Sequence, residues 1–218
     1  MPRFLFVVLA FSLFTFACNE KEDAVDVSHI KAKSEIVRFD QDLFSLDTTQ
    51  WTKALAGLKG KYPHFWNIYS KHILPLTPDS ALYDQALLAF VKDGQVRRLY
   101  DTTQVLIGGL DDYQKDLSEA FKRVKYYFPK FKEPVVYTCF TEFGFQKFIF
   151  SDGPKDGIGL GLEMFLGKDY PYKRIDPTNP NFSAYLTRTF DKAYLTKKTV
   201  DLIVDDLVGS LGGVRLLV

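Results

Sequence analysis

The N-terminal segment is the feature that most limits what this chain can fold into, because it is apolar where a domain surface would be polar. Residues 4–16 read FLFVVLAFSLFTF, and Arg3 is the basic residue in front of them. A helix needs about 20 apolar residues to cross a bilayer, so this run is too short. A short apolar run behind a basic residue is typical of a secretory signal peptide. We therefore predict a signal peptide over residues 1–17, which leaves the fold to the residues that follow.

The end of this run, Ala17 and Cys18, resembles the lipobox of bacterial lipoproteins, in which the cysteine becomes the lipidated first residue. Thr15 and Phe16 depart from that pattern, where a leucine and a small residue are usual. The alternative is ordinary cleavage near Ala17, which leaves Cys18 as a spare thiol. We favour lipidation of Cys18, because a cysteine directly after an apolar signal segment has little other use. The predicted location is the cell envelope, with a lipid anchor in a membrane, the outer membrane in preference, facing the periplasm or the cell surface.

A polar segment follows Cys18 and reads NEKEDAVDVSHIKAKSE over residues 19–35. It carries too little apolar surface to fold by itself. We therefore predict a lipidated flexible tether over residues 18–34 and a single domain over residues 35–218. Within the tether, Lys21-Glu22-Asp23 resembles a signal that sends lipoproteins to the cell surface in Bacteroidetes, and plain solubility is the alternative explanation.

The overall charge is balanced, with 28 Lys and Arg against 27 Asp and Glu. No surplus of positive charge is available to neutralise phosphates, so we expect no nucleic-acid partner. Hydrophobic residues make up 46% of the chain, which is ordinary for a globular protein and excludes wholesale disorder. Aromatic residues reach 16%, and part of this excess belongs to the signal segment. The remaining aromatics stand mostly at helical or strand spacing, so we expect them in the core.

The spacing of apolar residues predicts a mostly helical domain with one short region of strands. Helices are predicted over residues 51–58, 64–74, 78–91, 95–106, 111–128, 182–190 and 199–208. An extended entry is predicted at residues 36–40, and β-branched and aromatic runs predict strands at 135–140 and 145–150. We expect the latter two to form a small antiparallel sheet, which gives the fold class α+β. The chain ends on apolar residues, so we expect the native domain to be truncated at its C-terminus.

Side chains with catalytic or metal-binding chemistry are sparse. The three histidines, His29, His64 and His72, do not have the spacing of a zinc helix. Cys139 falls inside a predicted strand, where a buried thiol is expected in place of a nucleophile. Ser151 lies in a turn without the glycines of a nucleophile elbow. We therefore expect no catalytic residue, no cofactor and no metal ligand.

Two weaker candidates lie around a glycine-rich stretch, Gly157-Ile158-Gly159-Leu160-Gly161. Its spacing fits neither a phosphate-binding loop nor a dinucleotide fingerprint. Glu142 and Glu163 flank the stretch and could work as a pair of catalytic carboxylates. The alternative is that each is an ordinary solvated or hydrogen-bonded carboxylate.

The stretch GIGLGLEMFLGKDYPY, residues 157–172, resembles a segment of the gliding-motility lipoprotein family GldB of Bacteroidetes. Further agreement comes from Arg38-Phe39-Asp40, from Lys61-Tyr62-Pro63 and from Tyr185-Leu186, so the resemblance covers residues 35–208 together with the lipoprotein start. Glu163 departs from the family pattern, which often has an aspartate there. The residues that match the family motif are Ile158, Gly159, Leu160, Leu166, Gly167, Asp169, Tyr170 and Pro171.

The resemblance implies a zincin-like fold, similar to metalloproteases, in which a zinc-binding helix would correspond to residues 199–208. That segment offers Asp201, Asp205 and Asp206 but no histidine. The implied function is therefore non-enzymatic: a membrane-anchored lipoprotein that supports gliding motility and type IX protein secretion through other gliding and secretion proteins. The alternative is a zinc-dependent peptidase whose metal ligands are missing from this chain. A third hypothesis, a glycan- or small-molecule-binding module, would require exposed Trp51 or Trp66 in a groove.

Overall fold

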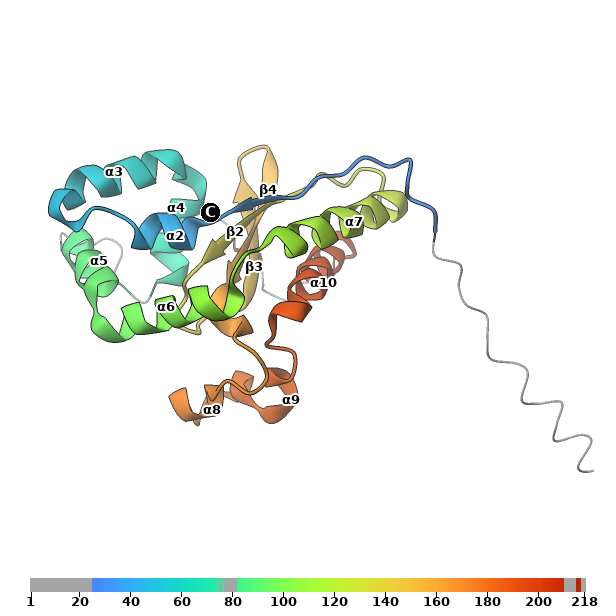
Figure 1. Cartoon of the computed structure of the whole chain (residues 1–218). Helices are drawn as coiled ribbons and strands as arrows, with labels where there is room; N and C mark the ends of the chain where they lie inside the picture. The colour runs from blue at the N-terminus through green and yellow to red at the C-terminus, as the bar shows by residue number, and fades with distance from the viewer. Residues whose placement is uncertain (1–24, 75, 77–81, 210–214, 217–218) are drawn as a thin grey trace, which may run out of the picture.

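A mixed β-sheet crosses the middle of the molecule, with helices on both of its faces (Figure 1). The structure is a computed structural model that describes residues 25–74, 76, 82–209 and 215–216. The predicted signal peptide and Cys18 lie outside these residues. Within them, no helix combines the length and the apolar character that crossing a bilayer requires.

The sheet contains five strands in the order β1-β2-β4-β3-β5. Their bounds are β1 Glu35–Val37, β2 Val135–Cys139, β3 Lys147–Asp152, β4 Lys155–Gly161 and β5 Arg215–Leu216. Strands β1, β2 and β4 are parallel neighbours, β4 and β3 form an antiparallel hairpin, and β5 pairs in parallel with β3. The predicted antiparallel pairing of residues 135–140 with residues 145–150 is therefore wrong. Strand β4 lies between β2 and β3, and the sheet is mixed.

Strand β4 was not predicted, because its alternate residues are glycines. Gly157 and Gly159 face Phe150 and Phe148 of the neighbouring strand. A Cβ atom added to Gly159 would lie 2.0 Å from Cζ of Phe148, and one on Gly157 would lie 2.2 Å from Cζ of Phe150. The two phenylalanine rings thus occupy the space that side chains of β4 would need. Glycine usually weakens a strand, and here the cross-strand rings supply the missing burial.

Most predicted helices are present at the expected positions. The α-helices of the described residues are α2 Phe39–Phe44, α3 Trp51–Lys61, α4 Pro63–Ile68, α5 Tyr83–Lys92, α6 Gly94–Ile107, α7 Asp111–Tyr127, α8 Tyr172–Ile175, α9 Ala184–Thr187 and α10 Leu195–Leu207, of which α2 and α8 were not among the predicted helices. The helix predicted for residues 64–74 continues after α4 as a π-helical turn, Tyr69–Ile73. The helix predicted for 182–190 is wrong beyond one turn, because Ser183 caps α9 and the chain leaves helical geometry after Thr187.

Two apolar cores lie on opposite faces of the sheet. The first is formed by α2 to α5 with Tyr137, Phe148 and Phe150 of the sheet, and the second by α7 and α10 with Ile158 and Leu160. Alternate residues of a strand point to opposite faces, so β2 and β3 contribute side chains to both cores, whereas β4 contributes Ile158 and Leu160 to the second core alone. The first core is dominated by rings, with Phe65 stacked 4.4 Å from Tyr137 and Phe39 edge-on to Phe65 at 4.7 Å. The predicted role of the aromatic excess as core is confirmed at these positions.

The described half of the predicted tether is packed against the domain. Ser34 is fully buried, and its hydroxyl donates to the carbonyl of Gln114 in α7 at 2.8 Å. Val27 is also buried, and the Lys125 ammonium donates to the carbonyl of Lys31. Residues 25–34 therefore belong to the folded domain, in contrast to the predicted flexible tether over 18–34. The reason is that α7 offers polar partners and an apolar face that local composition does not reveal.

Candidate functional site

The most unusual polar group of the described domain is the carboxylate of Glu163. It lies in a 3-10 turn, Leu162–Phe165, which directly follows β4 and is buried throughout. Glu163 itself is completely buried. The turn between β2 and β3 passes over it, so two segments about twenty residues apart meet at this side chain. A buried carboxylate is costly unless its oxygens are hydrogen-bonded, which makes its partners informative.

The two carboxylate oxygens of Glu163 differ in their hydrogen bonds. Oε1 accepts from the Thr141 backbone N–H at 2.6 Å, from the Thr141 hydroxyl at 2.5 Å and from the Phe143 N–H at 3.2 Å. Oε2 is buried and has no hydrogen-bond partner among the described residues. Burial raises the pKa of Glu163 to about 7, although the bonds from Thr141 and Phe143 favour the charged form. The carboxyl group therefore titrates near neutral pH.

The carboxylate holds the β2–β3 turn in an unfavourable backbone conformation. Glu142 and Phe143 have φ values of 50° and 64°, in the left-handed region that residues other than glycine rarely adopt. Their neighbours Thr141 and Gly144 close the turn through an N–H to carbonyl bond of 3.0 Å. Such strain persists only where surrounding contacts over-determine it, and here the bonds to Glu163 provide those contacts.

The strained turn forms part of the wall of a surface groove of about 600 Å³. Glu142 and Phe143 line it together with apolar side chains of α5 and α6. Glu163 does not line this groove, since it lies beneath the turn. The predicted pairing of Glu142 with Glu163 as catalytic carboxylates is therefore not supported, because the two side chains do not face a common cleft. The arrangement positions the turn, and Glu163 is buried beneath it.

The residues of the family motif have structural positions around this turn. Ile158 and Leu160 are buried in the second core, and Gly159 lies beneath the Phe148 ring. Leu166 donates its N–H to the Tyr172 hydroxyl at 2.8 Å, and Gly167 adopts a φ of 109° that favours glycine. Tyr170 is half-buried, whereas Asp169 and Pro171 are exposed. The motif thus builds β4 and the passage from the sheet to the segment that holds α8 and α9.

A second buried carboxylate, Asp40, is fully hydrogen-bonded. Its two oxygens accept from the Arg38 guanidinium at 2.8 and 3.0 Å, from the Gln104 amide at 2.8 Å and from the Thr138 hydroxyl at 2.5 Å. The group joins α2 to β2 and α6. In the sequence, Arg38-Phe39-Asp40 stood out only through the family resemblance, and the structure shows that these residues connect the start of the domain to the sheet.

The described residues do not fit a zinc ion. They contain no group of three His, Cys, Asp or Glu side chains that could hold a metal. His29, His64 and His72 are all exposed, and they lie on different elements. On α10, which contains the segment that the resemblance aligns with a zinc-binding helix, Asp201 pairs with Lys197 at 2.6 Å.

The remaining candidates have ordinary structural positions. Cys139 is buried as predicted, and burial raises the pKa of its thiol well above the usual range, which opposes formation of a thiolate. Ser151 is exposed on β3. Trp51 is buried and donates its indole N–H to the carbonyl of Asp84, and Trp66 is half-buried against Tyr83. Neither tryptophan is presented in an open groove, so the binding-module hypothesis loses its support.

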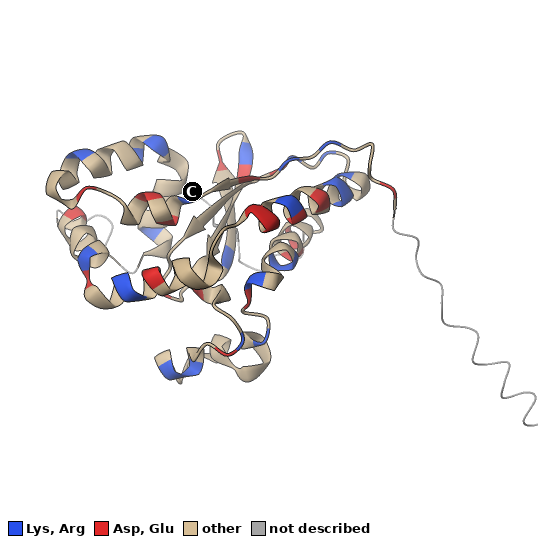
Figure 2. Ribbon diagram, in the orientation of Figure 1, with Lys and Arg blue, Asp and Glu red and all other residues tan. Residues whose placement is uncertain are grey.

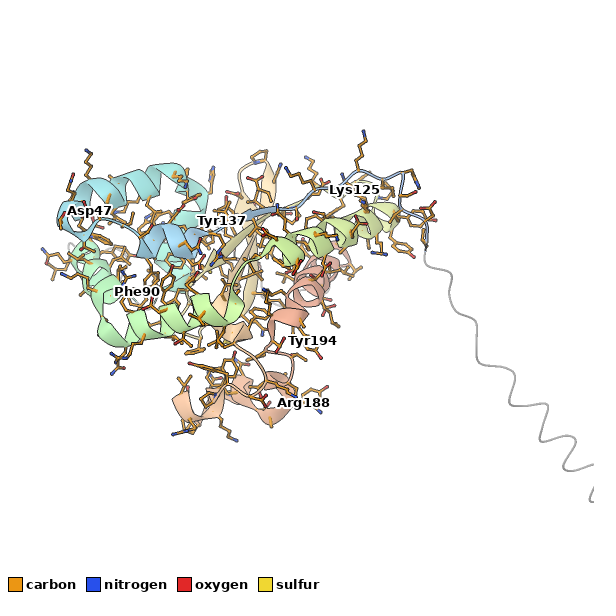
Figure 3. The ribbon with its side chains drawn as sticks, in the orientation of Figure 1. Asp47, Phe90, Lys125, Tyr137, Arg188 and Tyr194 are labelled. Carbon is orange, nitrogen blue, oxygen red and sulfur yellow. The ribbon has the colours of Figure 1, made fainter. Side chains whose placement is uncertain are left out.

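A basic and aromatic surface that the sequence did not predict lies around α9 (Figure 3). Tyr185, Leu186 and Tyr194 are exposed there, and Arg188 and Lys198 lie among them. Tyr185 and Leu186 were noticed only as part of the family resemblance. The available signal was two tyrosines and several cations within fifteen residues, with no apolar face of sufficient length to bury them.

Comparison with known proteins identifies one family. A family model described as gliding motility protein GldB matches residues 20–217. The chain matches no curated protein and no solved structure. The zincin-like architecture expected from the resemblance therefore stays a prediction.

Proposed function

The chain belongs to the family of the gliding motility protein GldB, since the family match covers nearly its whole length, and we propose that it acts as a lipid-anchored envelope protein that supports gliding motility and type IX protein secretion. The family match is the observation that carries this proposal. The Ala17-Cys18 pair after an apolar segment supports the lipid anchor. The role is assembly or support of the export machinery through protein contacts.

The site geometry favours a supporting role over catalysis. The carboxylates of Glu163 and Asp40 are engaged in holding a turn and a chain entry, and the described residues present no metal cluster beside a groove. The alternative from the resemblance, a zinc peptidase, would require at least three zinc ligands close together, and the described residues contain no such group. We propose accordingly that the protein is not an enzyme.

Deletion of the gene followed by complementation tests the proposed role. The deletion strain should lose spreading on agar and export of surface adhesins, and the intact gene should restore both. Unchanged spreading and export in a host that glides would remove the proposal. The zinc content of the purified protein tests the alternative, a zinc-dependent peptidase. Stoichiometric, tightly held zinc would contradict the proposed non-enzymatic role.

Replacement of Cys18 by serine tests the anchor separately. Cys18→Ser should move the protein from the membrane fraction to the soluble fraction and abolish incorporation of labelled palmitate, because serine cannot form the thioether that carries the lipid. Asn19→Ala is the matched control, because it alters the neighbouring residue and keeps the thiol. If Cys18→Ser still sediments with membranes and carries label, the predicted lipidation is wrong.

A further inference from the structure

The surface around α9 contains two adjoining hollows on the side of the molecule where Arg188 and Tyr194 lie (Figure 3). One, of about 400 Å³, lies against the start of β3, and the other, of about 440 Å³, lies between α9 and α10. Leu186 and Lys198 line both hollows, so the two adjoin, and we call them together the α9 groove. It is separate from the groove beside Glu142.

Large apolar side chains are exposed around the α9 groove. Tyr185 is 73% exposed, and Leu186 and Tyr194 are each 37% exposed. Arg188 lies 5.1 Å from the centre of the Tyr185 ring, which favours the outward position of that ring through a cation–π contact. Exposed aromatic residues together with arginine are the composition that protein interfaces favour.

The charge of the α9 groove is of one sign. Lys147, Arg188 and Lys198 line it, and among the described residues no aspartate or glutamate does. Figure 2 shows basic residues on the first turn of α10, the helix that carries Lys198. Neither lysine has an ion pair within the described structure. Lys147 donates instead to the carbonyl of Lys198 at 3.1 Å, and Asp201, which acts on both lysines electrostatically, is already paired with Lys197.

Both lysines are partly stripped of water. Burial lowers the pKa of Lys147 and of Lys198 relative to an exposed lysine, and the nearby Asp201, together with Asp205 in the case of Lys147, offsets this only in part. A partly desolvated ammonium without a counter-ion gains more from an incoming carboxylate than an exposed ammonium does, because the local dielectric is lower. Charge complementarity therefore indicates an anionic occupant.

We propose that the α9 groove is a docking site for a protein segment that combines acidic residues with apolar side chains. The carboxylates would contact Lys147, Arg188 and Lys198, and the apolar side chains would fill the two hollows beside Leu186. A flat anionic membrane could meet the charges and the exposed tyrosines, but it would not fill the two hollows. The proposal holds whether or not the protein takes part in gliding.

Photo-crosslinking in the native host tests the proposal on the full-length protein. p-Benzoylphenylalanine is placed at Tyr185, where it keeps an aromatic ring in the same position. The matched control site is Tyr127, which is 64% exposed on α7 outside the groove. We expect a discrete protein adduct at position 185, and we expect mass spectrometry of the adduct to locate an acidic segment that contains apolar residues.

Charge-reversal variants test whether crosslinking at position 185 depends on the positive charge of the α9 groove or only on the exposure of that position. Lys198→Glu and Arg188→Glu should each lower the yield of the adduct at least about fivefold, since charge reversal at an interface weakens association strongly. Lys198→Arg should retain it. Lys53→Glu is the control, because it makes the same change of charge at an exposed position on α3. Circular dichroism of each variant confirms that the fold is retained.

Four outcomes would overturn the proposal. The yield at position 185 could be no higher than at position 127, or the crosslinked segment could be neutral or basic. Lys198→Glu could lower the yield no more than Lys53→Glu does. The adduct could also be lipid in place of protein, which would assign the surface to membrane contact.

Discussion

The buried carboxylate of Glu163 should make the stability of the protein depend on pH in a way that one substitution removes. Glu163→Gln keeps the size of the side chain and an oxygen that can accept from Thr141 and Phe143, but it cannot ionise. The wild-type protein must either bury a charge whose second oxygen has no partner or retain a proton on it. The two proteins should therefore diverge as the pH rises.

The size and sign of the effect follow from the pKa of Glu163. Burial raises this pKa from its ordinary value near 4.5 to about 7. Between these two pH values the folded state binds more protons than the unfolded state, so the free energy of unfolding falls as the pH rises. The stabilisation is fully present below pH 4.5 and is lost as the pH rises through 7. The difference of pKa corresponds to about 3 kcal/mol.

Urea unfolding between pH 4.5 and 8.5 measures this difference. The free energy of unfolding of the wild-type protein should fall by about 3 kcal/mol relative to that of Glu163→Gln over this range. Other carboxyl groups, such as Asp42 with its lowered pKa, are common to both proteins and cancel in the comparison. Asp101→Asn, which removes one carboxylate from an exposed position on α6, is the control for the loss of a carboxylate elsewhere. Parallel profiles for Glu163→Gln and the wild type would refute the reasoning.

Three further predictions concern the core. Gly159→Ala places a Cβ where the Phe148 ring lies, so it should lower the free energy of unfolding by about 1–3 kcal/mol. Gly57→Ala is the control and should not destabilise the protein, because the space around Gly57 is open. Equal effects of the two substitutions in thermal unfolding would contradict the packing of the Phe148 ring over Gly159. Asp40→Ala should cost about 3–5 kcal/mol by urea unfolding, because it leaves a half-buried guanidinium without its partner, and a loss below 1 kcal/mol would contradict this. In Cys18→Ser protein at neutral pH, Cys139 should resist a thiol reagent until denaturant is added, and rapid labelling of the folded protein would show that the thiol is accessible.

Local sequence patterns predicted most of the helices, because the apolar residues that form the buried face of a helix are only three or four positions apart in the sequence. Helix α7 is an example: Asp111 and Asp112 stand in its first turn, and Leu117, Phe121 and Val124 form its buried face. The same reasoning failed for residues 182–190, where apolar residues at helical spacing serve a short turn and a bridge between Leu166 and Asp191. Spacing alone does not distinguish a continuous helix from short turns that bury the same side chains.

The candidate site was predicted in part. Glu163 was noted as a flanking carboxylate, and its position among Leu162, Met164 and Phe165 was a signal of burial. Its partners could not be predicted, because the hydrogen bonds from Thr141 and Phe143 cross about twenty residues of chain. The α9 groove was missed for the same reason, since Lys147 and Lys198 lie 51 residues apart in the sequence.

The sequence by itself determined the family, the mostly helical character, and the buried role of most aromatic residues, because each of these rests on residue types and on short spacings. Only the tertiary structure decided that β4 separates β2 from β3, that residues 25–34 belong to the domain, and that the Glu163 carboxylate holds the β2–β3 turn in its strained conformation. These features depend on which distant segments meet. The glycines of β4 show the physical reason most clearly: in the sequence they resemble breaks in structure, and in the fold two phenylalanine rings from the neighbouring strand cover them.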